Sequence, residues 1–337
     1  MIRNRYSRAT VAVFAALALM TTVTTAAASA SITGAGSTLV APILANWKSG
    51  FERGGGTGVQ YSPVGSGAGI AQITARTVDF GASDAPLTRE QANSCNSCVQ
   101  IPWALSATGI GYNLPVRGLK LTGPVLAEIY LGKIKKWNDR RIKRINKGKR
   151  LPGLKITPIF RNDGSGDTYA FTDYLSRVSG QWKRKVGFAT SVGFPTGVGA
   201  KGNLGLTNTL KKTRGAIAYI SVSYLIAAGS KVAAIQNRAK RYVFPNLKNI
   251  ANAASIVKRV PSSNTVSIAD PPRKAKIAYP LSTFTYAIVP KSSSKKGEIK
   301  SFITYALTKG QRFGAALNFP PLPKVVLRAA KRANSRL

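Results

Sequence analysis

The sequence predicts an α/β fold with a ligand site at the carboxyl ends of several strands. Strand-like apolar runs lead four times into a turn rich in Gly, Ser, Thr or Asp, at residues 34–38, 65–69, 81–84 and 161–168. A single Gly-Ser turn is common in loops of every kind, but loop composition alone does not explain four of them at strand ends. Because ligands of open α/β sheets bind outside the carboxyl ends of strands, the four turns predict one shared site.

The clearest of these turns is Arg161–Thr168. The apolar run 156–160 before it predicts a buried strand, and apolar residues recur at helical spacing in 169–178 after it. A turn from a strand into a helix presents unpaired backbone N–H groups and the positive end of the helix dipole. This turn also carries glycines for close approach, two hydroxyl groups and a guanidinium, and therefore predicts an oxyanion site built from Gly164, Gly166, Ser165, Thr168 and Arg161.

Two earlier stretches have the same order of strand, turn and helix. Residues 31–47 combine a short strand, a Gly-containing turn and apolar residues at helical spacing, with Thr38 at the position of a helix cap or an anion ligand. Residues 59–75 repeat the order around a Gly-Ser-Gly turn, and the strand-like run 78–83 ends at Asp84. These stretches predict hydroxyl groups, backbone N–H groups and one acid at the same edge of the sheet.

Residues 1–30 have the organisation of an export signal. Arginines precede the apolar stretch 11–20, and the small residues 28–30 follow as a cleavage site. The apolar stretch is too short for a good membrane span, and no Cys follows it as a lipid attachment point. We therefore expect an exported protein, periplasmic or extracellular, without a lipid anchor or a transmembrane helix.

The chain is strongly basic and contains no histidine. It has 50 Lys and Arg against 11 Asp and Glu, a formal net charge of +39. Such an excess predicts attraction to small anions, polyanions or anionic membranes and says nothing about the fold. The absence of His excludes His-based triads, His general bases and His-containing metal sites. We predict neither a metal site nor a cofactor.

The two cysteines of the chain, Cys95 and Cys98, are close together in a Cys-x-x-Cys motif. This motif admits a redox or a metal-binding interpretation, but a thioredoxin-like site needs a different setting and zinc needs more ligands. We favour a small-loop disulfide formed in an oxidising compartment.

Two other segments are open to more than one interpretation. Residues 126–139 are amphipathic, and the densely basic run 140–150 is either a patch for polyanions or membranes or, as we favour, a solvated face. The Gly-rich stretch 187–205 either approaches the ligand site or forms a surface loop. The basic tail 328–337 is expected to fray.

Four motifs resemble those of the phosphate-binding proteins (PstS family) of bacterial phosphate ABC transporters. They are TGAGST at 33–38, VDFGASDAP at 78–86, IYLGKIKKWN at 129–138 and RNDGSG at 161–166. The second and third are long and distinctive, and the resemblance covers nearly all of the chain after residue 30. It implies a two-lobed, periplasmic-binding-protein-like (type II) α/β fold with a hinge and a ligand cleft between the lobes. On this pattern, lobe I combines 31–109 with 286–337, and lobe II spans 110–285.

The resemblance also implies a set of phosphate ligands. Asp84 corresponds to the acid that accepts a proton of phosphate, and Asp163 to the acid that orients the guanidinium. The remaining positions correspond to hydrogen-bond donors: Thr38, Leu39, Ser66, Arg161, Ser165 and Gly166. Many members of the family have Thr where this chain has Asp167, whereas a mycobacterial-like branch has Asp. Asp167 is therefore implied as a second acceptor, with a helix N-cap that does not touch the ligand as the alternative.

The function implied by the resemblance is that of a solute-binding protein, not an enzyme. Such a protein captures inorganic phosphate outside the cytoplasm and delivers it to a membrane-embedded ABC permease. A secreted phosphatase-like enzyme is an alternative, opposed by the missing His and the lack of a recognisable activated nucleophile. A protein that adheres to envelope polyanions is another. No specific nucleic-acid partner is expected, because aromatic residues do not alternate with the basic runs. Electrostatic attachment of the basic surface to an anionic envelope is a further hypothesis.

Overall fold

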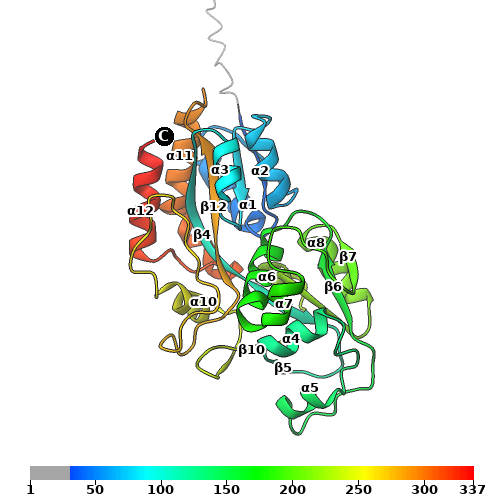
Figure 1. Ribbon diagram of the computed structural model, residues 1–337. Helices are drawn as coiled ribbons and strands as arrows, with labels where there is room; N and C mark the ends of the chain where they lie inside the picture. The colour runs from blue at the N-terminus through cyan, green and yellow to red at the C-terminus, as the bar shows by residue number, and fades with distance from the viewer. Residues whose placement is uncertain (1–30) are drawn as a thin grey trace, which may run out of the picture.

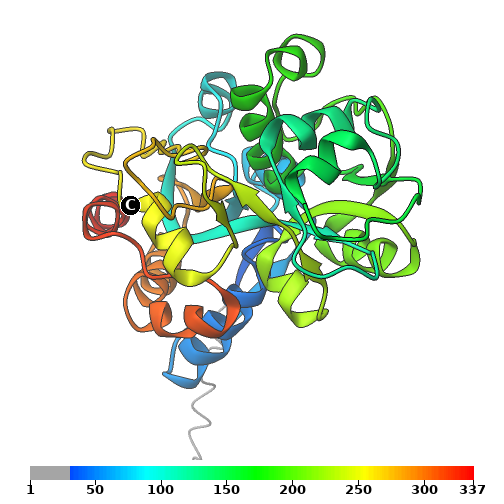
Figure 2. The ribbon, with the colours of Figure 1, turned by 90° about the horizontal axis from the view of Figure 1, so that it is seen from below.

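The structure, a computed structural model, describes residues 31–337, and the expected export signal at 1–30 lies outside them. The chain forms two lobes, one above the other in Figure 1 and side by side in Figure 2. Blue, orange and red segments build the first lobe, so it combines early and late parts of the chain, and green segments build the second. The predicted two-lobed α/β fold is confirmed.

One sheet runs through both lobes. Its strands are β1 (Ile32–Gly36), β2 (Val59–Ser62), β3 (Phe80–Ser83), β4 (Cys98–Tyr112), β6 (Thr157–Arg161), β7 (Val198–Ala200), β8 (Ala216–Ser221), β9 (Lys231–Val232) and β12 (Ser282–Pro290). The order is β2-β1-β3-β12-β4-β8-β6-β7, and β9 also pairs with β4. In the first lobe β1 is parallel to β2 and β3, while β12 is antiparallel to β3 and β4. In the second lobe β6 is parallel to β7 and β8.

Strand β4 joins the two lobes. Its residues 98–107 pair with β12, and its residues 108–112 pair with β8. All of its residues from 100 to 112 are buried, which explains why this stretch of sequence is almost continuously apolar. In Figure 1 the strand runs from the upper lobe into the lower one.

The helices of the first lobe are α1 (Ala41–Arg53), α2 (Ser66–Thr74), α3 (Arg89–Ser94), α11 (Lys296–Leu307), the 3-10 helix η1 (Lys309–Leu317) and α12 (Lys324–Ser335). They cover the sheet around an aromatic core. Trp47 of α1 packs edge-to-face on Trp103 of β4 with ring centroids 5.2 Å apart, and Phe80 and Phe302 complete the cluster. The Trp47 indole donates to the carbonyl of Gly310 over 2.9 Å, so its buried N–H has a partner.

The expectation that the basic tail frays is wrong. Residues 324–335 form α12, which buries Val326, Ala329, Ala330 and Ala333. The small alanines let the helix lie close to the first lobe while its cations stay outside. Packing of this apolar face, not charge, decides whether the segment is ordered.

The helices of the second lobe are α4 (Gly123–Tyr130), α5 (Arg140–Ile145), α6 (Gly166–Val178), α7 (Gly180–Lys185), α8 (Gly202–Lys212) and α9 (Val222–Ala227). Only the first part of the amphipathic stretch 126–139 is helical. Gly132 has φ +74° and follows the end of α4, as glycine commonly does at helix ends. Beyond it Trp137 is fully buried and donates to the carbonyl of Gly215 over 2.9 Å.

A smaller sheet and a long connection lead back to the first lobe. The sheet has the order β11 (Tyr242–Val243), β10 (Ala234–Gln236) and β5 (Lys120–Leu121), and α10 (Leu247–Ala254) follows it in the chain. Beyond α10, the Gln100 side chain of β4 donates to the Ser263 carbonyl and the Thr265 hydroxyl, each over 2.8 Å. The connection 255–281 is thereby fastened to β4 well before β12 begins.

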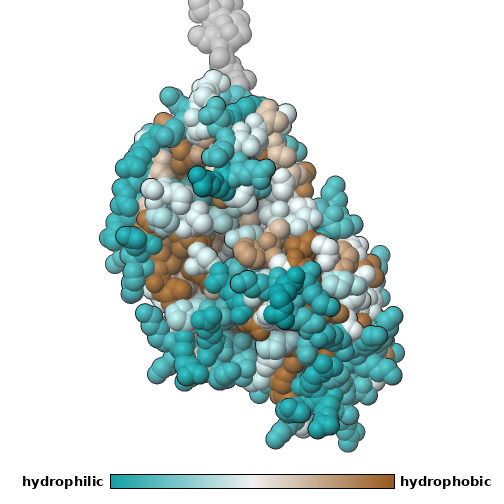
Figure 3. Space-filling model, viewed as in Figure 1, coloured by the Kyte–Doolittle hydropathy of each residue, from teal (hydrophilic) through white to brown (hydrophobic). Residues whose placement is uncertain are grey.

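The surface is largely hydrophilic on the face shown in Figure 3, above all over the lower end of the second lobe and along α12. Within residues 31–337, no helix has the length and apolar character that a membrane span requires. In the basic run, Lys143 and Arg144 of α5 are exposed while Ile142 is buried.

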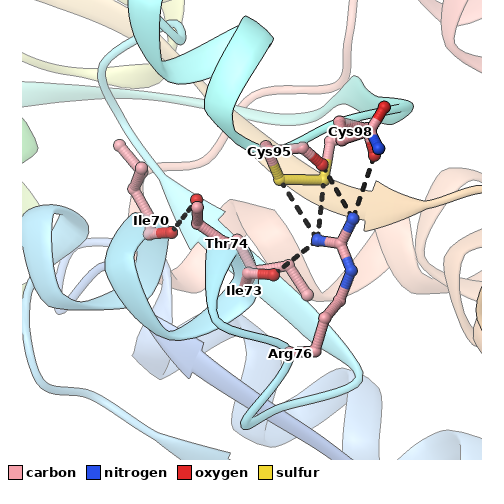
Figure 4. Close-up of a disulfide and its surroundings, with 7 residues drawn as sticks. Ile70, Ile73, Thr74, Arg76, Cys95 and Cys98 are labelled. Atoms are coloured by element: carbon pink, nitrogen blue, oxygen red, sulfur yellow. Dashed lines mark hydrogen bonds between the residues drawn. A yellow bond between two sulfur atoms is a disulfide. The ribbon is translucent and has the colours of Figure 1, made fainter.

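Cys95 and Cys98 form a disulfide with an S–S distance of 2.00 Å, which confirms the favoured interpretation. The bond closes the turn between α3 and β4. Figure 4 shows the Arg76 guanidinium beside the two sulfur atoms. It donates to the carbonyls of Ile73, Cys95 and Asn96 over 2.7 to 2.9 Å, and so ties the end of α2 to the disulfide turn.

Candidate functional site

The turns predicted from the sequence meet where the two lobes face each other. The Gly67 N–H donates to the Gly164 carbonyl over 3.0 Å. The Gly166 N–H donates to the Ser66 hydroxyl over 3.1 Å, and the Arg161 guanidinium donates to the Thr38 hydroxyl over 3.2 Å. Each of these bonds joins one lobe to the other, so segments distant in sequence form a single site.

Glycine permits this close approach of the lobes. Gly65, directly before α2, has φ +100°, a conformation that L side chains rarely adopt. A Cβ added at Gly166 would lie 2.4 Å from the Asp84 Cβ, and one at Gly67 would lie 3.0 Å from the Gly164 Cα. The first turns of α2 and α6 therefore lie at the interface between the lobes, where the N–H groups of Gly67 and Gly166 form hydrogen bonds across it.

Asp84, at the end of β3, is an acid held among hydroxyl groups. Its side chain is almost completely buried, and the Ser37 hydroxyl lies 2.6 and 2.7 Å from its two carboxylate oxygens. The Ser66 hydroxyl donates to it over 3.4 Å. Burial and, after it, the charge of Asp167 raise the pKa of Asp84 to about 7, against the hydrogen bonds from Ser37 and the charge of Arg161.

Arg161, the last residue of β6, is the buried cation of the site. Asp163 binds its guanidinium through two hydrogen bonds, one of 2.6 Å from Nε and a second from Nη2. Burial opposes the charge of Arg161, but the hydrogen bond to Asp163 and the charges of Asp167 and Asp163 together outweigh it and raise the pKa of the guanidinium. Burial also acts to raise the pKa of Asp163, yet Arg161 lowers it below the usual range. Asp163 therefore holds the guanidinium in place and leaves Nη1 directed toward Thr38.

Asp167 lies in the first turn of α6 but does not cap it. Ser165 is the N-cap, since its hydroxyl accepts a bond from the Thr168 N–H over 3.2 Å, so the N-cap interpretation of Asp167 is wrong. Asp167 is buried and accepts bonds from the Thr108 hydroxyl (2.6 Å) and the Asn203 amide (2.7 Å). Its Oδ2 is 3.7 Å from Nη1 of Arg161. Burial raises its pKa, against the charge of Arg161.

The remaining predicted residues lie in the same region. Leu39 is fully buried in the turn between β1 and α1, next to Thr38. Thr38 is not a helix cap, because the N-cap of α1 is Val40, and its hydroxyl accepts bonds from Arg161 and Asn203 instead. The structure thus brings to one region between the lobes all nine positions that the resemblance implied: Thr38, Leu39, Ser66, Asp84, Arg161, Asp163, Ser165, Gly166 and Asp167.

Three residues of the site were not predicted: Ser37, Thr108 and Asn203. Asn203, at the start of α8, donates to both Thr38 and Asp167 and accepts a bond from the Ser221 N–H over 2.8 Å. It belongs to the Gly-rich stretch 187–205, so part of that stretch does approach the site. Ser37 could have been identified from the sequence, because it lies inside the TGAGST motif. Thr108 lies inside β4, and no sequence motif marks it as part of the site.

The arrangement suits a small anion that carries its own hydrogen atoms. Hydroxyl groups, backbone N–H groups and one guanidinium supply donors to anionic oxygens. The two buried acids would repel a fully deprotonated anion, but each can accept a hydrogen bond from a protonated one.

Comparison with known proteins agrees with this geometry. A family model described as a PBP superfamily domain matches residues 21–309. The phosphate-binding protein PstS of Xylella fastidiosa (strain Temecula1) is 36% identical over 302 residues, which cover 88% of this chain and 82% of the relative. The PstS protein of Haemophilus influenzae is 36% identical over 307 residues, which cover 89% and 91%.

Solved structures share the fold at lower identity. A putative phosphate ABC transporter substrate-binding protein with bound phosphate from Clostridium perfringens has a TM-score of 0.66 at 19% identity, covering 87% of this chain and 100% of that one. A high affinity periplasmic phosphate-binding protein bound with phosphate has a TM-score of 0.71 at 20% identity, covering 90% and 93%. From the family match and the identities to its relatives, the chain belongs to the PstS family of phosphate-binding proteins within the PBP superfamily.

Proposed function

We propose that this protein captures inorganic phosphate between its lobes and delivers it to a membrane-embedded ABC permease. The observation that carries the proposal is the position of Asp84, a buried acid among hydroxyl donors at the junction of the lobes. The names of its relatives and the phosphate bound by proteins of the same fold support it.

In this proposal the donors surround the phosphate oxygens and the acids face its hydrogens. The donors are Thr38, Leu39, Ser66, Arg161, Ser165 and Gly166. Asp84 accepts one P–OH hydrogen bond, Asp167 accepts a second, and Asp163 orients Arg161. The contact of Asn203 with Thr38 and Asp167 supports its role as a residue that holds donor and acceptor together.

The acids give the site its selectivity against sulfate. Near neutral pH phosphate carries one or two hydrogens and sulfate carries none. A site with an acceptor for such a hydrogen rejects an analogue that lacks it by roughly 10⁴-fold or more. Two acceptors would favour the monobasic ion, which has two hydrogens to donate.

The lobes are proposed to move about β4. Between residues 107 and 108 this strand exchanges its partner β12 for β8, which makes this point a natural hinge. The fastening of residues 263–266 to β4 and β12 favours a lobe boundary before α10 over the boundary at residue 285. In the open form the cleft admits the ion, and the permease recognises the closed form.

We infer a binding protein, not an enzyme, that acts in the periplasm or outside the cell. The chain has no His to activate a nucleophile, and the serine hydroxyl nearest an acid, that of Ser37, bonds to Asp84 without an intervening base. Attachment to an anionic envelope through the basic surface is a separate part of the proposal. A wash of cells with concentrated salt should then release the protein, and retention in that wash would refute the attachment.

Calorimetry tests the central proposal. Phosphate is expected to bind tightly, with one ion per chain, and an equal concentration of sulfate should produce no measurable heat. Incubation with a chromogenic phosphate ester should release no product. Absence of phosphate binding, equal binding of sulfate or turnover of the ester would each contradict the proposal.

A further inference from the structure

A cationic groove lies on the outer side of the first lobe. One recess of about 300 Å³ is lined by Lys291, by Arg332 of α12 and by Arg336, which directly follows α12. A second recess of about 460 Å³ is lined by Arg89 and Cys98. The two recesses share Val99, Ser262 and Asn264 and therefore adjoin each other. We call them together the cationic groove, defined by its cations Arg89, Lys291, Arg332 and Arg336.

The groove is lined by four cations and by no acid. Among residues 31–337, the ion pairs of the protein involve none of these four side chains. Cations outside ion pairs are common in so basic a chain, so the presence of four of them does not by itself indicate a binding site. What distinguishes these cations is that they surround two adjoining recesses, where their fields add at an anion that spans both.

Hydrogen bonds hold the wall of the groove in place. The segment 261–265 lies between the two recesses and is bonded to β4, since the Asn264 amide donates to the Gln100 carbonyl over 2.9 Å. The Gln100 side chain in turn binds the segment at Ser263 and Thr265, and also accepts from the Leu87 N–H over 3.0 Å. Both amide side chains are buried. A bound ligand would therefore not have to order this segment.

Helix α12 supplies the opposite wall. Arg332 and Arg336 are one helical turn apart and stand on the same side of the helix. Ala329 and Ala333 line the recess beside them, and their small side chains leave the space that the cations surround. In Figure 3 hydrophilic side chains follow the edge of the molecule over α12.

We propose that the cationic groove binds inorganic polyphosphate, a linear polymer with a high density of negative charge. No aromatic side chain lines the groove, which argues against a nucleic acid, whose bases stack on aromatic rings. The groove is independent of the cleft between the lobes. Val99 in the groove and Thr108 at the cleft lie on the same strand, about 30 Å apart at roughly 3.3 Å per residue.

The test uses charge-matched variants in saturating inorganic phosphate, which keeps the cleft occupied. The groove variant carries Lys291→Glu and Arg332→Glu, and its control carries Lys143→Glu and Arg144→Glu in the exposed helix α5. Binding of fluorescent polyphosphate is measured at several salt concentrations. The groove variant should lose about tenfold or more in affinity, because it changes cations that contact the polymer. The control should lose about threefold or less. Since both variants lose the same net charge, a difference between them reports the location of the binding site. Arg332→Gln, which removes a charge without placing an acid near the helix end, should show part of the loss.

Three outcomes would overturn the proposal. They are no binding by the unaltered protein, an equal or greater loss in the control, and equally tight binding of poly-glutamate, which would indicate a response to charge alone. Phosphate titrations of the cleft are run on every variant and should be unchanged. A variant that fails this titration is replaced by Arg332→Gln, so a folding defect is not mistaken for a result.

Discussion

The backbone N–H of Gly166 donates a hydrogen bond to the hydroxyl of Ser66, a residue 100 positions earlier in the chain and in the other lobe. The same hydroxyl lies 3.2 Å from the backbone N–H of Asp84, which donates to it. One serine thus connects the beginning of α6, the beginning of α2 and the end of β3. A change at any of the three is therefore expected to affect anion binding through the other two.

Asp84→Asn should reduce selectivity more than affinity. The amide presents donors to sulfate where the carboxylate repels it, while its oxygen still accepts a P–OH hydrogen bond. We expect discrimination between phosphate and sulfate to fall by about 100-fold or more and phosphate affinity to fall less. Competition calorimetry measures both quantities, and unchanged selectivity would remove Asp84 from the proposed role.

Gly166→Ala should prevent the lobes from closing. The added Cβ would lie 2.4 Å from the Asp84 Cβ, so the present arrangement becomes impossible, whereas an open form has no such clash. We expect phosphate affinity to fall by at least about 100-fold with a nearly unchanged melting temperature. Small-angle scattering should show no compaction on addition of phosphate. Gly297→Ala is the matched control, since a Cβ there meets no atom within 4 Å. Normal compaction of Gly166→Ala would contradict this account.

Asn203→Ala should weaken the site through its neighbours. The substitution leaves Asp167 and the Ser221 N–H each without a bond that they make in the buried site. Loss of a partner to a buried polar group costs roughly 1–3 kcal/mol, so phosphate affinity should fall by about 10- to 100-fold. Leu204→Ala, at an exposed neighbouring position, should have little effect. Equal affinities of the two variants would exclude the proposed role of Asn203.

Ionisation of Asp84 should destabilise the phosphate-free protein increasingly as the pH rises from about 4 to 7. In the folded protein burial raises the pKa of Asp84 to about 7, so the folded state binds more protons than the unfolded state over this interval. This destabilisation is absent below the pKa that Asp84 has in the unfolded state, and it is fully present above the pKa of Asp84 in the folded state. Urea denaturation at a series of pH values measures it, and Asp84→Asn should flatten the slope. An equally steep slope in that variant would assign the effect to other groups.

Local sequence patterns predicted most of the strands, turns and helices that carry the site residues. The strand, turn and helix around 156–178 are observed as β6 and α6, because a buried apolar run, a Gly-Ser turn and helical spacing all favour the same local structure. The paired cysteines were likewise predicted from composition. The resemblance to a known family supplied individual ligand positions that spacing alone did not single out.

The sequence by itself therefore determined the α/β class, the turns at strand ends and the acid and cation of the proposed anion site. Only the tertiary structure decided that Thr108 and Asn203 bind Asp167, that the basic tail forms a packed helix and that the connection 255–281 returns to β4. The reason is physical. A turn or a helix follows from interactions between neighbours in the chain, whereas these contacts join residues brought together by packing of the two lobes, and no local pattern records them.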